Sequence, residues 1–81
     1  MYDAVFDSAD KVETFEDFVE FLLVLEASFK AEGTAWENPT IDRMMESAAA
    51  WAIDTAERDP LTKNPTWQNF AQILSAGIIY E

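Results

Sequence analysis

Three helix-start signals, each followed by apolar residues at spacings of three and four, restrict the fold of this 81-residue chain most strongly. Thr14 can cap free backbone N–H groups with its hydroxyl, and the acids that follow it favour the positive end of a helix dipole. Segments 38–40 and 64–66 both read Asn-Pro-Thr, in which Asn can be the N-cap and Pro the first helical residue. Gly33 suits the C-terminal cap of the first helix. The signals predict three main helices, at about residues 15–31, 39–58 and 65–78.

The same periodicity predicts which side chains form the core. With successive residues about 100° apart, the first helix has an apolar stripe and, roughly opposite, an acidic ridge. The stripe consists of Phe15, Phe18, Leu22, Leu25 and Phe29, and the acidic ridge consists of Glu13, Glu16, Asp17 and Glu20. Leu23 and Val24 fall beside the ridge, so either another element such as residues 2–6 covers them or they form part of a contact surface. The predicted core faces of the other two helices include Ile41, Met44, Met45, Ala48 and Trp51, and Trp67, Phe70, Leu74 and Ile78.

These elements predict a single all-α domain over residues 1–81, arranged as a small orthogonal bundle of three main helices. The sequence does not decide whether residues 2–10 form a short additional helix or a turn. The alanines at 48–50 have small side chains that let a neighbouring helix approach closely. Gly77 is interpreted as a fraying point or a C-terminal cap. The apolar tail 78–81 should pack back on the core.

The formal net charge of −11, from 16 acidic and 5 basic residues, disfavours one class of partner. Most nucleic-acid binders gain affinity from cations that displace counterions, so we expect no direct binding to a phosphate backbone. A basic protein would be attracted instead, although such charge also keeps a small protein soluble. No apolar stretch approaches the roughly 20 residues of a membrane helix, and no signal-peptide pattern is present. We therefore expect a cytoplasmic protein that does not bind membranes.

The residues most used in catalysis are missing from the sequence. It has no histidine and no cysteine, which removes the commonest proton shuttle, the most reactive nucleophile and any thiolate metal site. Its two glycines cannot form a phosphate-binding loop, and no EF-hand spacing occurs. We therefore expect no enzymatic activity, no cofactor and no metal site.

Three tryptophans, Trp36, Trp51 and Trp67, are the residues most easily taken for a binding site. Trp51 and Trp67 lie on predicted core faces, where aromatic rings are ordinarily buried. Trp36 precedes a helix start, so it can pack on the first turn as a hydrophobic staple or stay exposed as an anchor for a partner. Glu37 and Asn38 are interpreted as helix-start residues, although free amides at a helix N-terminus can also hold an anion.

Several segments carry a family resemblance. They are Ala35-Trp36-Glu37-Asn38, Thr40-Ile41, Ala48-Ala49-Ala50-Trp51-Ala52, Asn64-Pro65 with Trp67, Phe70-Ala71, Ile73-Leu74 and Tyr80-Glu81. In these the chain resembles an uncharacterised family of small bacterial single-domain proteins with a Trp-Glu-Asn signature. The family usually has a longer stretch between its second and third helices and a Trp directly after Asn-Pro, where Thr66 stands here. The resemblance implies a bacterial or phage origin and a helical domain, and it implies no activity.

The leading hypothesis is a small acidic interaction domain that binds a basic protein partner, with inhibition of that partner as one outcome. Its candidate contact residues are Glu13, Glu16, Asp17 and Glu20 as steering charges and Trp36 as the anchor. Immunity proteins, antitoxins and anti-defence inhibitors share this size and charge, which is an analogy only. The alternative is a self-associating structural module, in which Leu23 and Val24 or the apolar tail meet their counterparts, so that the chain is either a monomer or a homodimer.

Overall fold

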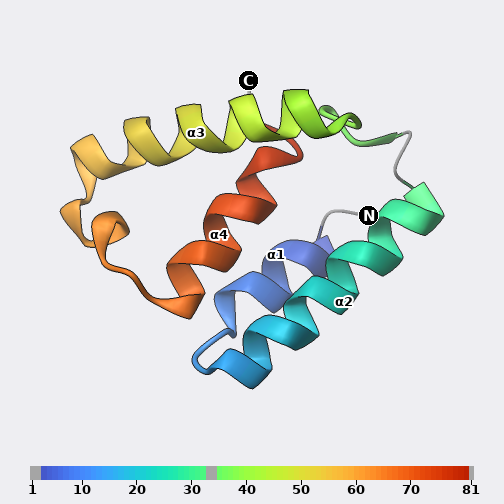
Figure 1. The fold of residues 1–81 in the computed structure, drawn as a ribbon, viewed down its shortest axis with the longest axis horizontal. Coiled ribbons are helices and arrows are strands. Elements are labelled where there is room, and N and C mark those ends of the chain that lie inside the picture. The colour runs from blue at the N-terminus through green and yellow to red at the C-terminus, as the bar shows by residue number, and fades with distance from the viewer. Residues whose placement is uncertain (1–2, 33–34, 81) are drawn as a thin grey trace.

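The computed structural model describes residues 3–32 and 35–80, and in this part of the chain all regular structure is helical. The elements are α1 (Asp3–Asp10), α2 (Phe15–Glu32), α3 (Ile41–Arg58), the short 3-10 helix η2 (Pro60–Lys63) and α4 (Trp67–Gly77). Figure 1 shows α1 and α2 side by side, with α4 between this pair and α3. The predicted all-α fold is confirmed. The sequence does not decide whether residues 2–10 form a helix; the structure has α1 there, so the described chain has four α-helices. Gly33 lies outside the described residues.

The start of α2 uses the capping residues that the sequence indicated. The Oγ1 of Thr14 accepts a hydrogen bond from the backbone N–H of Asp17 at 3.1 Å. In return, one carboxylate oxygen of Asp17 accepts from the backbone N–H groups of Glu13 and Thr14, at 3.1 and 3.3 Å. This reciprocal arrangement satisfies N–H groups that a helix start leaves without partners. The prediction of Thr14 as the cap is therefore confirmed.

The core lies where α1, α2 and α4 meet. Its largest fully buried side chains are Phe21, Ile78, Val5 and Val12. Val5 lies on α1 and Val12 comes two residues after the end of α1, and both belong to the same buried cluster as Phe21 of α2. The short N-terminal helix is thus part of the core and not an appendage. The predicted packing of the apolar tail is confirmed by Ile78, which is completely buried.

The predicted core stripe of α2 is wrong in part. Phe18 and Leu25 do pack against the core, but Phe15, Leu22 and Phe29 remain exposed. The buried side of α2 is centred on Phe21, a position about 100° away from Leu22 around the helix. The difference arises because the core cluster that α1 supplies lies against the Phe21 side of α2, leaving the predicted stripe at its edge.

Other apolar residues of α2 and α3 are also buried only in part. Val24 packs against the core, whereas Leu23 is exposed, so only one of the two is covered. On α3, Met44 packs against the core while Ile41 and Met45 are exposed. The main packing partners of α3 are α4 and η2, which leave Ile41 and Met45 uncovered while Ala48 and Trp51 of the predicted face are partly buried.

Helices α3 and α4 approach closely at Gly77. A Cβ atom built on Gly77 would lie 2.9 Å from the backbone oxygen of Met44 and 3.1 Å from the Cβ of Ala48. The sequence predicts a fraying point or a C-terminal cap at Gly77; in the structure it is the last residue of α4, the C-cap is Ile78, and no glycine of the described chain has a positive φ. Glycine is required at this position because any side chain would meet the backbone of α3. The predicted close packing at the small residues of α3 is confirmed at Ala48.

Asn38 ties the segment before α3 to the end of α4. Its backbone N–H donates to the carbonyl oxygen of Ile78 at 3.1 Å, and its Nδ2 donates to the carbonyl oxygens of Gly77 and Tyr80 at 3.1 and 3.0 Å. We call Asn38 and these three residues the C-terminal clasp. It satisfies carbonyls that the end of a helix leaves without partners. The interpretation of Asn38 as a helix cap is therefore wrong.

The two Asn-Pro-Thr segments share one conformation at threonine. Thr40 and Thr66 are the N-caps of α3 and α4, with φ/ψ of −109°/153° and −108°/153°. The Oγ1 of Thr66 accepts from the backbone N–H of Asn69 at 3.0 Å, whereas the side chain of Thr40 accepts no capping bond. Both helices therefore begin about two residues later than predicted, after threonine and not at proline.

Candidate functional site

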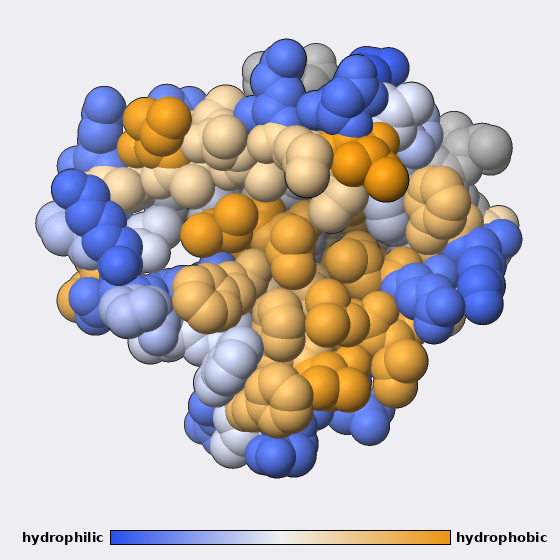
Figure 2. All heavy atoms as spheres, viewed as in Figure 1, coloured by the Kyte–Doolittle hydropathy of each residue, from blue (hydrophilic) through white to orange (hydrophobic). Residues whose placement is uncertain are grey.

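The first candidate site is an apolar surface where α2 and α4 lie side by side. The ring of Trp67 lies 5.3 Å from Phe15 and 5.3 Å from Phe18, and Phe70 lies 6.5 Å from Phe18. We define the apolar face as Phe15, Val19, Leu22, Trp67 and Phe70, which are between 38% and 53% exposed. Figure 2 shows hydrophobic residues gathered in one area over this region. Small soluble domains rarely leave so many large apolar side chains together in water unless they bind something.

The acidic ridge borders this apolar face along α2. Glu16 and Glu20 are exposed and lie about 100° and 140° around the helix from Phe15, next to Val19 and on the side away from α4. Glu13 is also exposed, just before the helix. Asp17 is partly buried and occupied by its capping hydrogen bonds. Glu13, Glu16 and Glu20 are therefore exposed around the start of α2, whereas Asp17 takes part in the helix start.

Trp36 lies apart from these charges and inside the fold. It is only 7% exposed, its ring packs edge-on at 5.1 Å from Phe29, and its Nε1 donates to the Oγ of Ser28 at 3.3 Å. Ser28 is about 18 Å along α2 from Glu16. The indole is thus a buried staple between the end of α2 and the start of α3. Of the other tryptophans, Trp51 is partly buried as expected, whereas Trp67 is half exposed.

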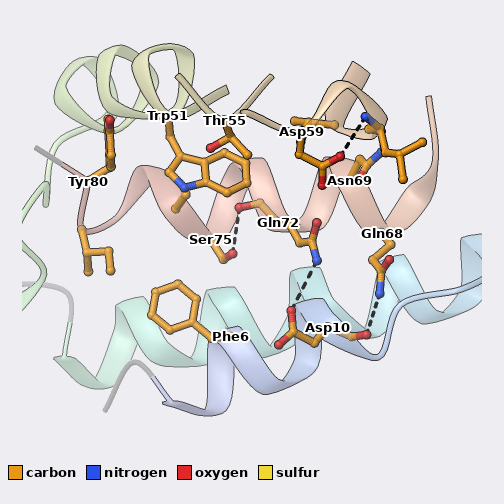
Figure 3. Close-up of a pocket in the computed structure, with 14 residues that line it drawn as sticks. Phe6, Asp10, Trp51, Thr55, Asp59, Gln68, Asn69, Gln72, Ser75 and Tyr80 are labelled. Carbon is orange, nitrogen blue, oxygen red and sulfur yellow. Dashed lines mark hydrogen bonds between the residues drawn. The ribbon is translucent and has the colours of Figure 1, made fainter. Parts of the chain in front are cut away.

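The second candidate site is a pocket of about 830 Å³ on the other side of α4. In Figure 3, α4 forms its floor, Phe6 and Asp10 of α1 lie on one wall, and Trp51 and Thr55 of α3 lie on the other. Residues of η2 close one end of the pocket, and Tyr80 lies toward the other. The hydroxyl oxygen of Thr55 is buried in this wall without a hydrogen-bond partner among the described residues.

Three side-chain amides of α4 line the pocket in orientations fixed by their partners. The Nε2 of Gln68 donates to the backbone oxygen of Asp10 at 2.8 Å, and the Nε2 of Gln72 donates to the carboxylate of Asp10 at 3.4 Å. The Nδ2 of Asn69 donates to the carbonyl oxygens of Leu61 and Asn64 at 2.9 and 2.8 Å. Carbonyl and carboxylate oxygens only accept, so each amide must present its NH2 group to the protein. Its own oxygen is left to accept from a ligand.

Tyr80 lies at the edge of the pocket, and its pKa is shifted in the folded protein. Its hydroxyl donates to Asp54, and this hydrogen bond is the main cause that raises the pKa of Tyr80 above its ordinary value of 10.0; desolvation and the charge of Asp54 add, and Arg58 opposes. Because folding favours the neutral phenol, the stability from this contact is present below about pH 10 and is lost as the pH rises through the raised pKa.

The test follows tyrosinate absorbance against pH in a Tyr2→Phe background, in which Tyr80 is the one remaining tyrosine. We expect a titration midpoint above that of a free tyrosine, and a return toward the free value in Asp54→Ala. Identical midpoints in the two proteins would show that the hydrogen bond to Asp54 has no effect in solution.

Other site types find no support in the described residues. Over residues 3–32 and 35–80, no group of three or more acidic side chains is placed to hold a metal ion. None of the helices in that part of the chain has the length and apolar character to cross a membrane.

Comparison with known proteins adds one finding. The model of a family of unknown function matches residues 14–81. No curated protein and no solved structure matches the sequence significantly. The family match includes the whole of the apolar face, whereas Phe6 and Asp10 of the pocket precede it.

Proposed function

The chain belongs to DUF7660, a family of unknown function, and we propose that it is a protein-interaction domain whose apolar face docks a basic, amphipathic segment of a partner protein. The observation that carries the proposal is the exposure of the apolar face. Trp67 contacts both Phe15 and Phe70, yet each of these three large aromatic side chains remains at least 38% exposed. Aromatic side chains of this kind are the usual anchors of protein interfaces.

The charge at the border of the face supports a basic partner. Glu16 and Glu20 lie beside Val19, so an apolar segment seated on the face would have its edge next to two carboxylates. Lysine or arginine side chains can place their alkyl stems on the apolar surface and their charges against these acids. The net charge of −11 would also increase the association rate of such a partner. In this proposal the anchors are Trp67 and Phe70, while Trp36 supports the fold.

Charge also argues against self-association through the same face. Two copies joined there would bring two sets of exposed carboxylates together, each belonging to a chain of charge −11. Like-charge contacts at an interface cost free energy, whereas a basic segment removes that cost. A partner whose active surface includes the docked segment would be inhibited, as immunity proteins, antitoxins and anti-defence proteins inhibit theirs. This role, and a bacterial or phage origin, are part of the proposal.

The test uses two synthetic helical peptides with the same leucine face, one with lysine and one with glutamate on its other face. Titration calorimetry should show that the wild-type chain binds the lysine peptide and not the glutamate peptide. Leu22→Glu, which places a charge within the apolar face, should weaken binding at least tenfold. Ile53→Glu on α3 is the matched control, because it adds the same charge at an exposed position outside the face, and it should bind like the wild type.

Two outcomes would contradict the proposal. If both Leu22→Glu and Ile53→Glu bind the lysine peptide at least as tightly as the wild type, only the net charge attracts the peptide and the apolar face does not hold it. Light scattering at low and high salt gives the second check. A stable dimer that Leu22→Glu dissociates would show that a second copy covers the apolar face.

A further inference from the structure

We propose that the pocket between α1, α3 and α4 is a binding site for a small organic cation with a planar apolar body, such as an aromatic amidine or amine. This site is separate from the apolar face. Phe70 and Gln72 are two residues apart on α4, and therefore point to nearly opposite sides of that helix. Phe70 belongs to the apolar face and Gln72 lines the pocket. The two proposals can fail independently.

The polar part of the pocket consists of hydrogen-bond acceptors. The side-chain oxygens of Gln68, Asn69 and Gln72 are left to accept, because their NH2 groups donate to the protein. Asp10 and Asp59 add carboxylates, and one oxygen of Asp59 already accepts from the backbone N–H of Leu61 at 3.1 Å. A ligand that matches this set must supply donors, as ammonium, amidinium and guanidinium groups do.

The charge of the lining selects the same ligand class. Among the described residues that line the pocket there is no lysine or arginine, while two are aspartates. A carboxylate or phosphate ligand would find no cation and would face two negative charges. A cation would be attracted by both, and the partial enclosure of the site strengthens such charge interactions relative to open water.

The apolar part of the pocket fits a planar body. Figure 3 shows Trp51 on the α3 wall and Phe6 on the α1 wall, with Tyr80 on the same side as Trp51. Cations and planar groups are favoured against the faces of such rings. The volume of about 830 Å³ is within the range of sites that hold small ligands. Aromatic walls with an acceptor-rich floor therefore favour a ligand that is flat at one end and rich in N–H donors at the other.

The test compares benzamidine, benzamide and benzoate, three probes with the same ring that are cationic, neutral and anionic. Chemical shifts of the Trp51 indole and of the Gln68, Asn69 and Gln72 side-chain amides should change with benzamidine. We expect its dissociation constant to be at least tenfold lower than that of benzamide, and benzoate to cause no change. Magnetisation transfer from the probe should reach the rings of Trp51 and Phe6.

Two matched variants separate the pocket from the general negative charge. Asp59→Asn removes a pocket carboxylate but keeps an oxygen that can accept a hydrogen bond from the backbone N–H of Leu61. It should weaken the binding of benzamidine about fivefold. Asp7→Asn makes the same change at an exposed position of α1 outside the pocket, and it should leave binding unchanged. Equal effects of the two variants would overturn the proposal, as would tight binding of benzoate or contacts of the probe with the apolar face.

Discussion

Replacing Asn38 with aspartate is expected to lower the free energy of unfolding by about 3 kcal/mol. The substitution keeps the size of the side chain but turns two hydrogen bonds, to the carbonyl oxygens of Gly77 and Tyr80, into contacts between a carboxylate and two acceptors. Because the side chain is buried, water cannot compensate for the loss. An 81-residue domain has only about 4–12 kcal/mol to lose.

The second Asn-Pro-Thr segment offers a matched control. Asn64→Asp is the same change in the same local sequence at an exposed side chain, and it should alter stability by less than about 0.5 kcal/mol. Urea unfolding followed by tryptophan fluorescence gives both values. The difference between them should shrink as the pH falls to about 4, because a protonated aspartate can donate one of the lost hydrogen bonds. A small, equal effect of both variants would mean that the C-terminal clasp does not stabilise the fold.

Gly77→Ala should destabilise the protein by about 2 kcal/mol, against the direction that helix propensity predicts. Alanine within a helix is normally favoured over glycine by about 1 kcal/mol. Here the added Cβ would lie 2.9 Å from the backbone oxygen of Met44. Since backbone cannot rotate away as a flexible side chain can, α3 and α4 must separate, and contacts along their crossing are weakened.

The difference in helix propensity between alanine and glycine can be measured in the same protein. Ala49 is exposed on α3, and Ala49→Gly should lower the free energy of unfolding by about 1 kcal/mol. This value shows how much stability Gly77→Ala would gain if the added Cβ met no clash. Both are measured by urea unfolding with helicity followed by circular dichroism. An increase in stability for Gly77→Ala would show that the two helices are not as close in solution as in the structure.

The positions of the helices could be predicted from the sequence because their ends depend on neighbouring residues. Thr14 and Asp17 cap each other three residues apart, and proline with threonine marks the other two starts. The buried side of α2 could not be predicted in this way. That helix carries large apolar residues in nearly every direction, among them Phe21 and Leu22 about 100° apart, so periodicity alone allows more than one core face. Packing against α1 decides between them.

The candidate sites depend still more on contacts between distant residues. The acidic ridge can be recognised in the sequence because its members are close together, but the apolar face joins residues of α2 to Trp67 and Phe70, which helical periodicity places in the core. The pocket has no local signal, since its walls come from α1, α3, η2 and α4. Asn38 looked like a cap because capping is the common use of asparagine before a helix, and its true partners lie 39 and 42 residues later.

The distance in sequence between the partners of the C-terminal clasp has a consequence for biosynthesis. Asn38 has no acceptors for its side chain until residues 77–80 have been synthesised. Asp10 is hydrogen-bonded to Gln68, which lies 58 residues later in the chain. Contacts of such long range form late, because the intervening chain must first be closed into a loop. A nascent chain that ends before α4 can form α1, α2 and α3 but leaves Phe18 without Trp67 and Phe70. On the ribosome, the protein should therefore be a chaperone client until its last helix emerges.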